Sequence, residues 1–385
     1  MPILENISME NIKSYILHEQ LLVPKTEQKP RSGEGAAILL PGGVIYLVYC
    51  DFQGPHDHSR ADIVKVISKD QGRNWSEPEI LQSCVEGQNV MSPGLLRLDN
   101  GNIAFSFMQK TNDGNCLPFF RTSYDDAGTW TEPQLMISQP GYYVVNNDRL
   151  CQTSSGRIIL PYAYSPNVGL VEKSECGVIY SDDYGKNWTP GKQQIKINRE
   201  NVRTPLSLAD NSGNIWRQTL DAGIFCQEPG VIERDDGSLL MWARTNGAYM
   251  YMAVSNDGSD TWSDFQAAPD IISPVSPQSI KKIPGTGRML CVYNDHSDFR
   301  YGETEWNWRT PLSLAVSDDG GRSWRRIGDL ESDRSHSYCY TSILFLEDSV
   351  FFTYYQSVEC EKDGQMLRRN LASLKIKCVH MDLFK

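Results

Sequence analysis

The sequence predicts an all-β fold, a single six-bladed β-propeller made of four-stranded antiparallel blades. Three observations lead to it. An eight-residue phrase occurs five times, its copies start between 55 and 74 residues apart, and each copy follows short apolar segments separated by tight turns. A repeat of this length that contains several short strands is typical of propellers, in which each repeat forms one radial sheet.

The repeated phrase reads S-x-D-x-G-x-x-W and is clearest at residues 181–188. Asp183 can accept backbone N–H groups within a tight turn, Gly185 can take a positive φ, and Trp188 offers a large apolar plate where sheets meet. The other copies are residues 68–75, 123–130 with Ala127 at the glycine position, 255–262 with Ser259 there, and 317–324. We expect each copy to form an outer hairpin turn.

Pairs of strands joined by short polar turns, most of them containing glycine, precede the phrases and mark the start of each blade. The first two strands of each of the first four blades are expected at 35–40 and 44–50, 92–98 and 102–107, 150–153 and 157–162, and 231–234 and 238–243. The fifth and sixth blades begin near 276–283 and 338–346. Residues 1–30 are interpreted as a lead-in whose second half supplies the closing strand of the last blade, and residues 31–385 as the propeller, because a closed ring leaves no exposed sheet edge.

Composition limits the classes of function. Hydrophobic residues make up 40% of the 385 residues and aromatic residues 10%, which is ample for a large core and excludes disorder. The net charge of −11 argues against nucleic acid and membrane partners, since both favour a basic face. No secretory leader is visible and the ten cysteines form no C-x-x-C motif, so free thiols and a cytoplasmic location are expected, or secretion if a leader was removed. The oligomeric state stays open.

Ligands of a propeller bind where the first residues of the inner strands converge on the central channel. The residues at those positions are mostly polar, of the kinds that hold sugar hydroxyls, which indicates a glycan or a small sugar as the partner. They are Glu34, Gln88, Ser92, residues 146–149 including Arg149, Gln227, Glu228, Ser276, Gln278, Tyr338 and Tyr340.

The repeated phrase, the number of blades and several spacings resemble the sialidase (neuraminidase) superfamily, in which such phrases are called Asp boxes or BNR repeats. The resemblance covers nearly the whole chain after residue 30. It implies an exo-acting glycoside hydrolase that retains the anomeric configuration and releases a terminal, acidic, sialic-acid-like sugar. It also implies that no cofactor is used. A metal site around His56, Asp57 and His58 is not expected, because no matching ligand cluster occurs elsewhere in the sequence.

The resemblance also implies roles for individual residues. Its catalytic residues correspond to Tyr340 as nucleophile, with Tyr338 as the alternative, Glu228 as the base of that tyrosine, and Asp57 as general acid–base, with Asp62 as the alternative. A phenol whose charge is held by a nearby glutamate avoids the repulsion between an anionic nucleophile and a sugar carboxylate. Arg244 and Arg309 match two of the three arginines that hold the substrate carboxylate, a task that suits the planar guanidinium.

The first arginine of that family pattern is missing. Residues 31–38 read RSGEGAAI, and Glu34 lies nearest the expected position, so Arg31 and Arg149 are the candidates for a third cation. A carboxylate at Glu34 would face the carboxylate of the substrate. A hydrolase of the same architecture for a different sugar, and a non-catalytic glycan-binding propeller, are therefore the alternatives. Tyr340 beside Glu228, with Asp57 across the same funnel, would favour the enzyme.

Overall fold

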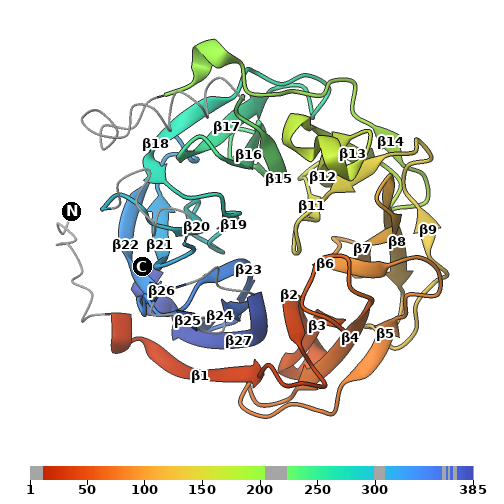
Figure 1. The fold of residues 1–385 in the computed structure, drawn as a ribbon, viewed down its shortest axis with the longest axis vertical. Helices are drawn as coiled ribbons and strands as arrows, with labels where there is room; N and C mark the ends of the chain where they lie inside the picture. Colours follow the sequence, from red (N-terminus) through yellow and green to blue (C-terminus); the bar gives the residue numbers. More distant parts are fainter. Residues whose placement is uncertain are drawn as a thin grey trace.

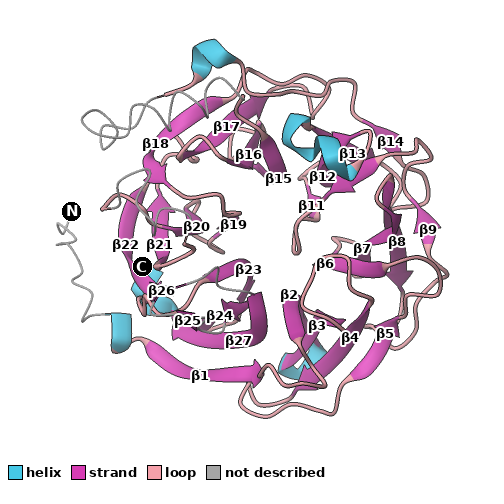
Figure 2. Cartoon of the chain, in the orientation of Figure 1, coloured by secondary structure: helices cyan, strands magenta, loops and turns pink. Residues whose placement is uncertain are grey.

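The computed structural model forms six blades around a central axis (Figure 1), as the sequence predicts. It describes residues 12–203, 223–298, 308–357 and 371–384, and the backbone of 361–362 and 365–366. Strands dominate the described residues and the helices are short (Figure 2). No helix among them is long and apolar enough to cross a membrane.

Each blade runs from the axis outward through antiparallel strands. The first blade comprises β2 (Arg31–Leu40), β3 (Val44–Phe52), β4 (Ala61–Ser68) and β5 (Glu79–Gln82). The second comprises β6 (Asn89–Arg97), β7 (Ile103–Asn112), β8 (Asn115–Ser123) and β9 (Gln134–Leu135). The third comprises β11 (Cys151–Gln152), β12 (Ile158–Ser165), β13 (Glu175–Ser181) and β14 (Thr189–Pro190). Strand β10 (Tyr142–Val144) pairs with both β8 and β12, and so joins the second and third blades into one sheet.

The other three blades complete the ring. The fourth comprises β15 (Cys226–Glu233), β16 (Leu239–Thr245), β17 (Tyr249–Ser255) and β18 (Gln266–Ile272). The fifth comprises β19 (Ser279–Lys282), β20 (Met289–Asn294), β21 (Leu312–Ser317) and β22 (Arg325–Glu331). The sixth comprises β23 (Tyr338–Phe345), β24 (Ser349–Ser357), β27 (Leu371–His380) and β1 (Ile16–Val23). Outside the blades lie the hairpin β25 (Glu361–Lys362) and β26 (Gln365–Met366) and the 3₁₀ turns η1 (Pro41–Gly43), η2 (Val168–Lys173), η3 (Arg199–Asn201) and η5 (Met381–Phe384).

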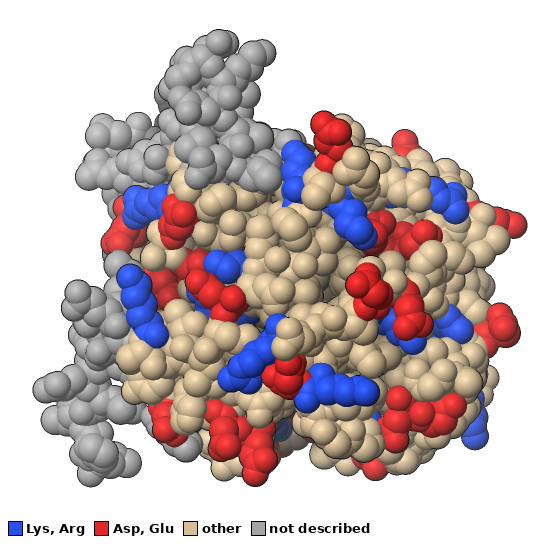
Figure 3. Space-filling model, turned by 90° about the horizontal axis from the view of Figure 1, so that it is seen from below, with Lys and Arg blue, Asp and Glu red and all other residues tan. Residues whose placement is uncertain are grey.

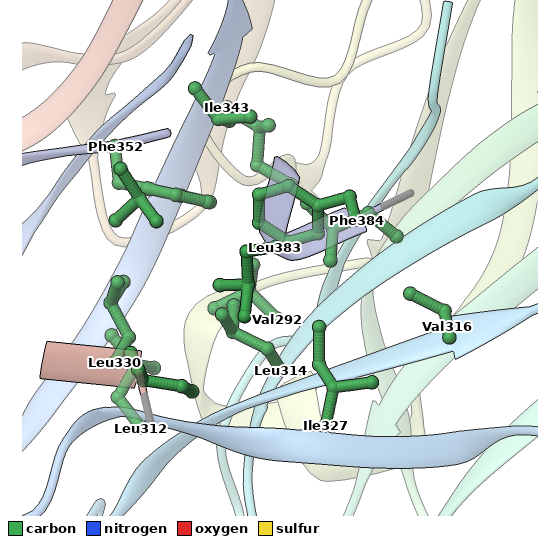
Figure 4. Close-up of a cluster of buried hydrophobic side chains, with 14 of the residues drawn as sticks. Val292, Leu312, Leu314, Val316, Ile327, Leu330, Ile343, Phe352, Leu383 and Phe384 are labelled. Carbon is green, nitrogen blue, oxygen red and sulfur yellow. The ribbon is translucent and has the colours of Figure 1, made fainter. Parts of the chain in front are cut away.

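The hydrophobic core lies between neighbouring blades. Alternate side chains of each strand point to opposite faces of its sheet, so both faces of a blade must be apolar. Figure 4 shows one such layer, in which Val292 and Leu314 of the fifth blade meet Ile343 and Phe352 of the sixth. Each such side chain contributes about 1.5–3 kcal/mol when buried. The layers hold the blades in a fixed ring, and the inner strand ends therefore have fixed positions around the axis.

The repeated phrases form the turns that their residues predict. Ser181 donates a hydrogen bond to Asp183 (2.8 Å), which in turn accepts the backbone N–H of Asn187 at 2.8 Å. Gly185 has a φ of +85°, and a Cβ at this position would lie 2.2 Å from the ring of Phe120 in the preceding blade. Ala127 and Ser259 take the same positive φ without being glycine, at a cost of about 1–2 kcal/mol each. The phrases therefore tie blades together and lie outside the site.

The ring closes through the N-terminal strand, because β1 pairs with β27 as the outer strand of the sixth blade. A buried ionic cluster supports this closure. Lys377 of β27 lies 2.8 Å from Glu19 of β1 and 3.0 Å from Glu331 of β22, and it also donates to the carbonyl of Leu330. Tyr354 donates to Glu331 from the neighbouring strand β24. The cluster links the fifth blade, the sixth blade and the N-terminal strand.

Replacing Lys377 with methionine is expected to destabilise the fold by about 1.5–3 kcal/mol, because Glu331, whose side chain is only 9% exposed, would lose one charged partner and keep Lys375 at 2.6 Å. Denaturant midpoints check the change. Lys192→Met is the matched control, since Lys192 pairs with Asp260 but is 69% exposed, and its loss should cost less than about 1 kcal/mol. Equal losses in the two variants would contradict a closing role for the cluster.

Charged side chains are mixed over the side of the molecule in Figure 3, where lysines and arginines alternate with aspartates and glutamates. The nine cysteines in the described part of the chain carry free thiols. Cys360 lies outside the described residues.

Candidate active site

The inner strands of four blades share a bulge that aims one side chain at the axis. Strands β2, β6, β15 and β23 each shift register at the same point relative to their neighbours. Glu34, Ser92, Glu228 and Tyr340 stand at these bulges with φ values of 55°, 53°, 45° and 59°. Such conformations cost about 1–3 kcal/mol each in residues other than glycine, and they cluster at functional sites. The four residues therefore mark the mouth of the channel as the candidate site.

A cavity of about 230 Å³ lies where these bulges converge. Its polar lining residues are Glu34, Asp57, His58, Ser92, Gln227, Glu228, Arg244 and Tyr340. The other lining residues are mainly apolar and include Met91, Met108, Tyr142, Tyr143, Val144, Val145, Val168 and Val171. A volume of this size accommodates part of a sugar residue with its substituents directed outward.

Tyr340 and Glu228 form a hydrogen-bonded pair among the polar lining residues. The hydroxyl of Tyr340 donates to Oε1 of Glu228 at 2.8 Å, and Nη1 of Arg244 donates to Oε2 at 2.8 Å. Burial and the negative charge of Glu228 raise the pKa of Tyr340 above its ordinary value, against the effect of Arg244 and Arg309. The phenol therefore keeps its proton in the free protein and directs it at a carboxylate that can accept it.

Arg309 contacts Cys339, the residue that directly precedes Tyr340 in the sequence. Its guanidinium is 5.5 Å from the centre of the Tyr340 ring. Its Nε donates to the carbonyl of Val275 at 3.2 Å, and its Nη1 lies 3.1 Å from Sγ of Cys339. Arg244 and Arg309 thus bring two positive charges to Tyr340.

Arg31 brings a third guanidinium to the site from the start of β2. Its Nη1 donates to Asp57, its Nη2 donates to Glu34 at 3.2 Å, and its Nε donates to the hydroxyl of Tyr355 at 3.0 Å. The guanidinium lies 4.3 Å from the centre of the Phe52 ring. Only 5% of the Arg31 side chain is exposed, so the cation has a fixed position.

The carboxyl groups beside Arg31 differ in their environments. Although 69% of the Asp57 side chain is exposed, partial desolvation acts to raise its pKa. The charge and hydrogen bond of Arg31 outweigh this effect, and the pKa is lowered. Glu34 is fully buried and accepts the N–H of Ser92 at 3.0 Å, and burial raises its pKa despite Arg31. The raised pKa makes this carboxyl easier to protonate than an exposed glutamate, while it stays paired with Arg31 at 3.2 Å.

The structure brings together most of the residues chosen from the sequence, but not all. Arg149 donates to the carbonyl of Gln278 at 2.6 Å, and Gln278 donates its amide to Ser273 and Ser276 within the fifth blade. Tyr338 packs edge-on to Tyr354 in the layer between the fifth and sixth blades. Asp62 accepts the N–H of Cys84. Among the described residues, none of Arg149, Gln278, Tyr338 and Asp62 lines the cavity. Arg31 and Arg309 do not line it either, but they contact the lining residues Asp57 and Tyr340.

The bulge at Tyr340 explains why Tyr338 does not join it. Strand alternation would place two residues that are two positions apart on one face. The positive φ of Tyr340 breaks that alternation, so Tyr338 points between the blades and Tyr340 points into the cavity. A Pro-Gly pair directly after the bulge residue, at Ser92 and Glu228, is the sequence signal that could have located two of the four bulges.

A buried lysine beside the site had no sequence signal. Nζ of Lys110 lies 2.6 Å from Nδ1 of His58 and 5.2 Å from the centre of the Tyr142 ring. Burial lowers its pKa. Lys110 therefore orders the loop that carries Asp57 and adds positive charge beside it.

A six-bladed propeller with Asp-box turns, a tyrosine–glutamate pair and three guanidiniums at its axis defines the class: this is a sialidase-fold protein. The chain belongs to the BNR repeat-like domain family, whose sequence model matches residues 120–353. The predicted resemblance is thereby confirmed, and the relation to sialidases is distant.

Three proteins of known sequence or structure are similar to this chain. A sialidase of Bacteroides fragilis (strain YCH46) is 22% identical over 245 residues, which cover 61% of this chain and 38% of that protein. A protein of unknown function from Dyadobacter fermentans DSM 18053 superposes with a TM-score of 0.67 at 17% identity, covering 95% of this chain and 98% of that one. The intramolecular trans-sialidase of Ruminococcus gnavus, in complex with oseltamivir carboxylate, gives 0.67 at 14%, covering 96% and 99%. The chain spans well under half the length of the curated relatives it matches.

Proposed function

We propose that this protein is a retaining exo-glycoside hydrolase of sialidase type that releases a terminal acidic, sialic-acid-like sugar from a glycan. The observation that carries the proposal is the hydrogen bond of 2.8 Å from Tyr340 to Glu228 in a cavity that Asp57 also lines. A nucleophile, its base and a general acid around one cavity are the minimum set for a double-displacement hydrolysis.

The first step would form a glycosyl–tyrosine bond. The oxygen of Tyr340 attacks the anomeric carbon while Glu228 accepts the phenolic proton. The bond between the anomeric carbon and the leaving oxygen breaks, and protonated Asp57 gives its proton to that oxygen. Arg244, which donates to Glu228, stabilises that carboxylate in the free protein and is partly released when Glu228 becomes neutral.

The second step would return the site to its starting state. A water molecule attacks the anomeric carbon from the side that the leaving group has vacated, and Asp57, now ionised, accepts its proton. The bond to Tyr340 breaks, and Glu228 returns the proton to the phenolate oxygen. Two displacements at one carbon retain its configuration.

The charges around the cavity support an acidic sugar. Arg31, Arg244 and Arg309 bring three permanent positive charges against the two carboxylates of Asp57 and Glu228, and burial raises the pKa of Glu34. The positive excess suits a sugar carboxylate, and two of the guanidiniums stand beside the nucleophile. The carboxylate ligand bound to the R. gnavus relative is consistent with this class of ligand.

The alternatives from the sequence can be weighed against the same geometry. A binding propeller without catalysis would leave Tyr340 between the blades, but Tyr340 lines the cavity and donates to Glu228. A different acidic sugar is the second candidate. Glu34 lies nearest the position of the first expected arginine and accepts the N–H of Ser92, so the cavity differs here from a site with three equivalent arginines.

A panel of aryl glycosides tests the function. We expect release of the aryl group from the α-ketosides of sialic acid or of a ketodeoxy sugar acid, weaker or no release from a uronide, and none from a neutral hexoside. Product analysis by NMR separates hydrolysis with retention from intramolecular transfer, the reaction named for the R. gnavus relative. Turnover of neutral glycosides alone, or inversion at the anomeric carbon, would contradict the proposal.

A further inference from the structure

We propose that Arg31 is a latch on the general acid. In the free protein Arg31 holds Asp57, and the carboxylate of an acidic substrate takes the place of Asp57 on Arg31, which releases Asp57 to protonate the leaving group. This inference rests on the proposed function and adds to it the order of events and the reason why an acidic sugar is required.

The geometry allows the exchange because one partner is fixed and the other is free to turn. Arg31 is enclosed by Phe52 and Tyr355, and two of its donor groups are committed to Tyr355 and Glu34. The side chain of Asp57 is 69% exposed. Asn89 anchors the backbone carbonyl of Asp57 at 2.9 Å, so the loop stays in place while the carboxylate rotates.

The groups that face Asp57 explain why the latch must open. Arg31, Arg309 and Lys110 all favour the ionised carboxylate, against burial, and the charge of Arg31 is the strongest of these effects, followed by its hydrogen bond. Glu34 is the neighbouring acid, and His58 next in the chain is bonded to Lys110. While Arg31 holds it, Asp57 is ionised and has no proton to donate. General acid catalysis needs a carboxyl whose pKa lies closer to the working pH.

A substrate carboxylate on Arg31 reverses both effects. It neutralises the cation that lowers the pKa of Asp57, and it adds a negative charge nearby that raises it. Asp57 therefore takes up a proton as the acidic sugar binds. A neutral sugar that fills the same cavity leaves Asp57 on Arg31, so it binds without being hydrolysed. The substrate carboxylate then contributes to kcat as well as to binding, which is a form of substrate selection at the chemical step.

Calorimetric titration of the full chain tests the latch without requiring turnover. The probes are 2,3-didehydro-2-deoxy-sialic acid and its primary amide, each titrated in two buffers of different ionisation enthalpy at about pH 5.5, between the ordinary pKa values of carboxyl and imidazole groups. The acid is expected to bind with net uptake of up to one proton, and the amide with none. Asp57→Asn is expected to abolish the uptake, because it removes the group that is protonated.

Asp113→Asn is the matched control. Asp113 is an exposed carboxylate near the same loop, 3.4 Å from His58, and its replacement should leave the proton uptake unchanged. Binding of the acid without proton uptake, or uptake that persists in Asp57→Asn, would overturn the latch and leave the proposed function standing. Failure of the acid to bind wild-type protein would overturn sialic acid as the substrate, and the latch with it.

Discussion

Replacing Tyr340 with phenylalanine is expected to lower kcat for hydrolysis by at least about a thousandfold, because one oxygen atom is the whole nucleophile. The ring that remains can keep its edge-on contact with Tyr355, 5.9 Å away between centres, so the bulge should persist. Glu228 loses one donor but keeps Arg244 at 2.8 Å. Steady-state rates on the aryl ketoside, with thermal unfolding of the same samples, measure the effect.

Tyr338→Phe is the control for that variant. Tyr338 is two residues away and buried in the layer between the fifth and sixth blades, so its replacement should leave kcat within about threefold of wild type. A variant at Tyr340 that hydrolyses like wild type, combined with an inactive variant at Tyr338, would reverse the assignment of the nucleophile.

Replacing Asp57 with alanine is expected to lower kcat by about 10²–10⁴-fold for substrates with an alkyl leaving group, which must be protonated as it departs. Substrates with a nitrophenyl leaving group, whose anion is stable, should lose much less in the first step. Asp62→Ala is the control, because Asp62 binds the N–H of Cys84 and does not line the cavity. Equal losses for both leaving groups would contradict the role of general acid.

The pH profile of the wild type follows from the same residue. A general acid must be protonated, so the rate falls as the pH rises through the pKa of Asp57 in the complex. Arg31 lowers that pKa in the free protein. The basic limb should therefore lie at lower pH for kcat/KM, which reports the free protein, than for kcat, which reports the complex. With the nitrophenyl substrate, Asp57→Ala should lack this limb.

The fold could be predicted from the sequence because its signals are local and repeated. Each Asp box needs only eight residues, and Ser181, Asp183 and Gly185 make contacts within their own turn. The boxes then mark where each blade must begin and end. The clash of a Cβ at Gly185 with Phe120 shows that the box also depends on the preceding blade, which no single repeat reveals.

The site was harder to predict because it depends on the local backbone. Glu228 and Tyr340 could be located by their spacing from the boxes, and they meet as expected. Tyr338 was retained as an alternative because a regular strand would place it beside Tyr340, and only the bulge separates the two. Arg149 was expected near the axis because it precedes an inner strand. Its guanidinium instead donates to the carbonyl of Gln278, which belongs to another part of the ring.

Arg31 shows the opposite case. It stands three residues before Glu34, which occupies a bulge and lies nearest the position where the resemblance implied an arginine. Its side chain nevertheless returns to the site and contacts both Asp57 and Glu34. The reach of a long side chain from a neighbouring position cannot be deduced from spacing, and for this reason the sequence left the source of a third cation open between Arg31 and Arg149.

Trapping of the covalent intermediate tests the central claim most directly. The chain is incubated with a fluorinated analogue of whichever sugar the glycoside panel identifies, which slows the second displacement, and is then analysed by intact-mass and peptide mass spectrometry. We predict the added mass of one sugar residue, located on Tyr340 and absent from Tyr340→Phe. A sugar attached to any other residue, or turnover of the substrate with inversion and no adduct, would contradict the assignment of Tyr340 and Glu228 as nucleophile and base.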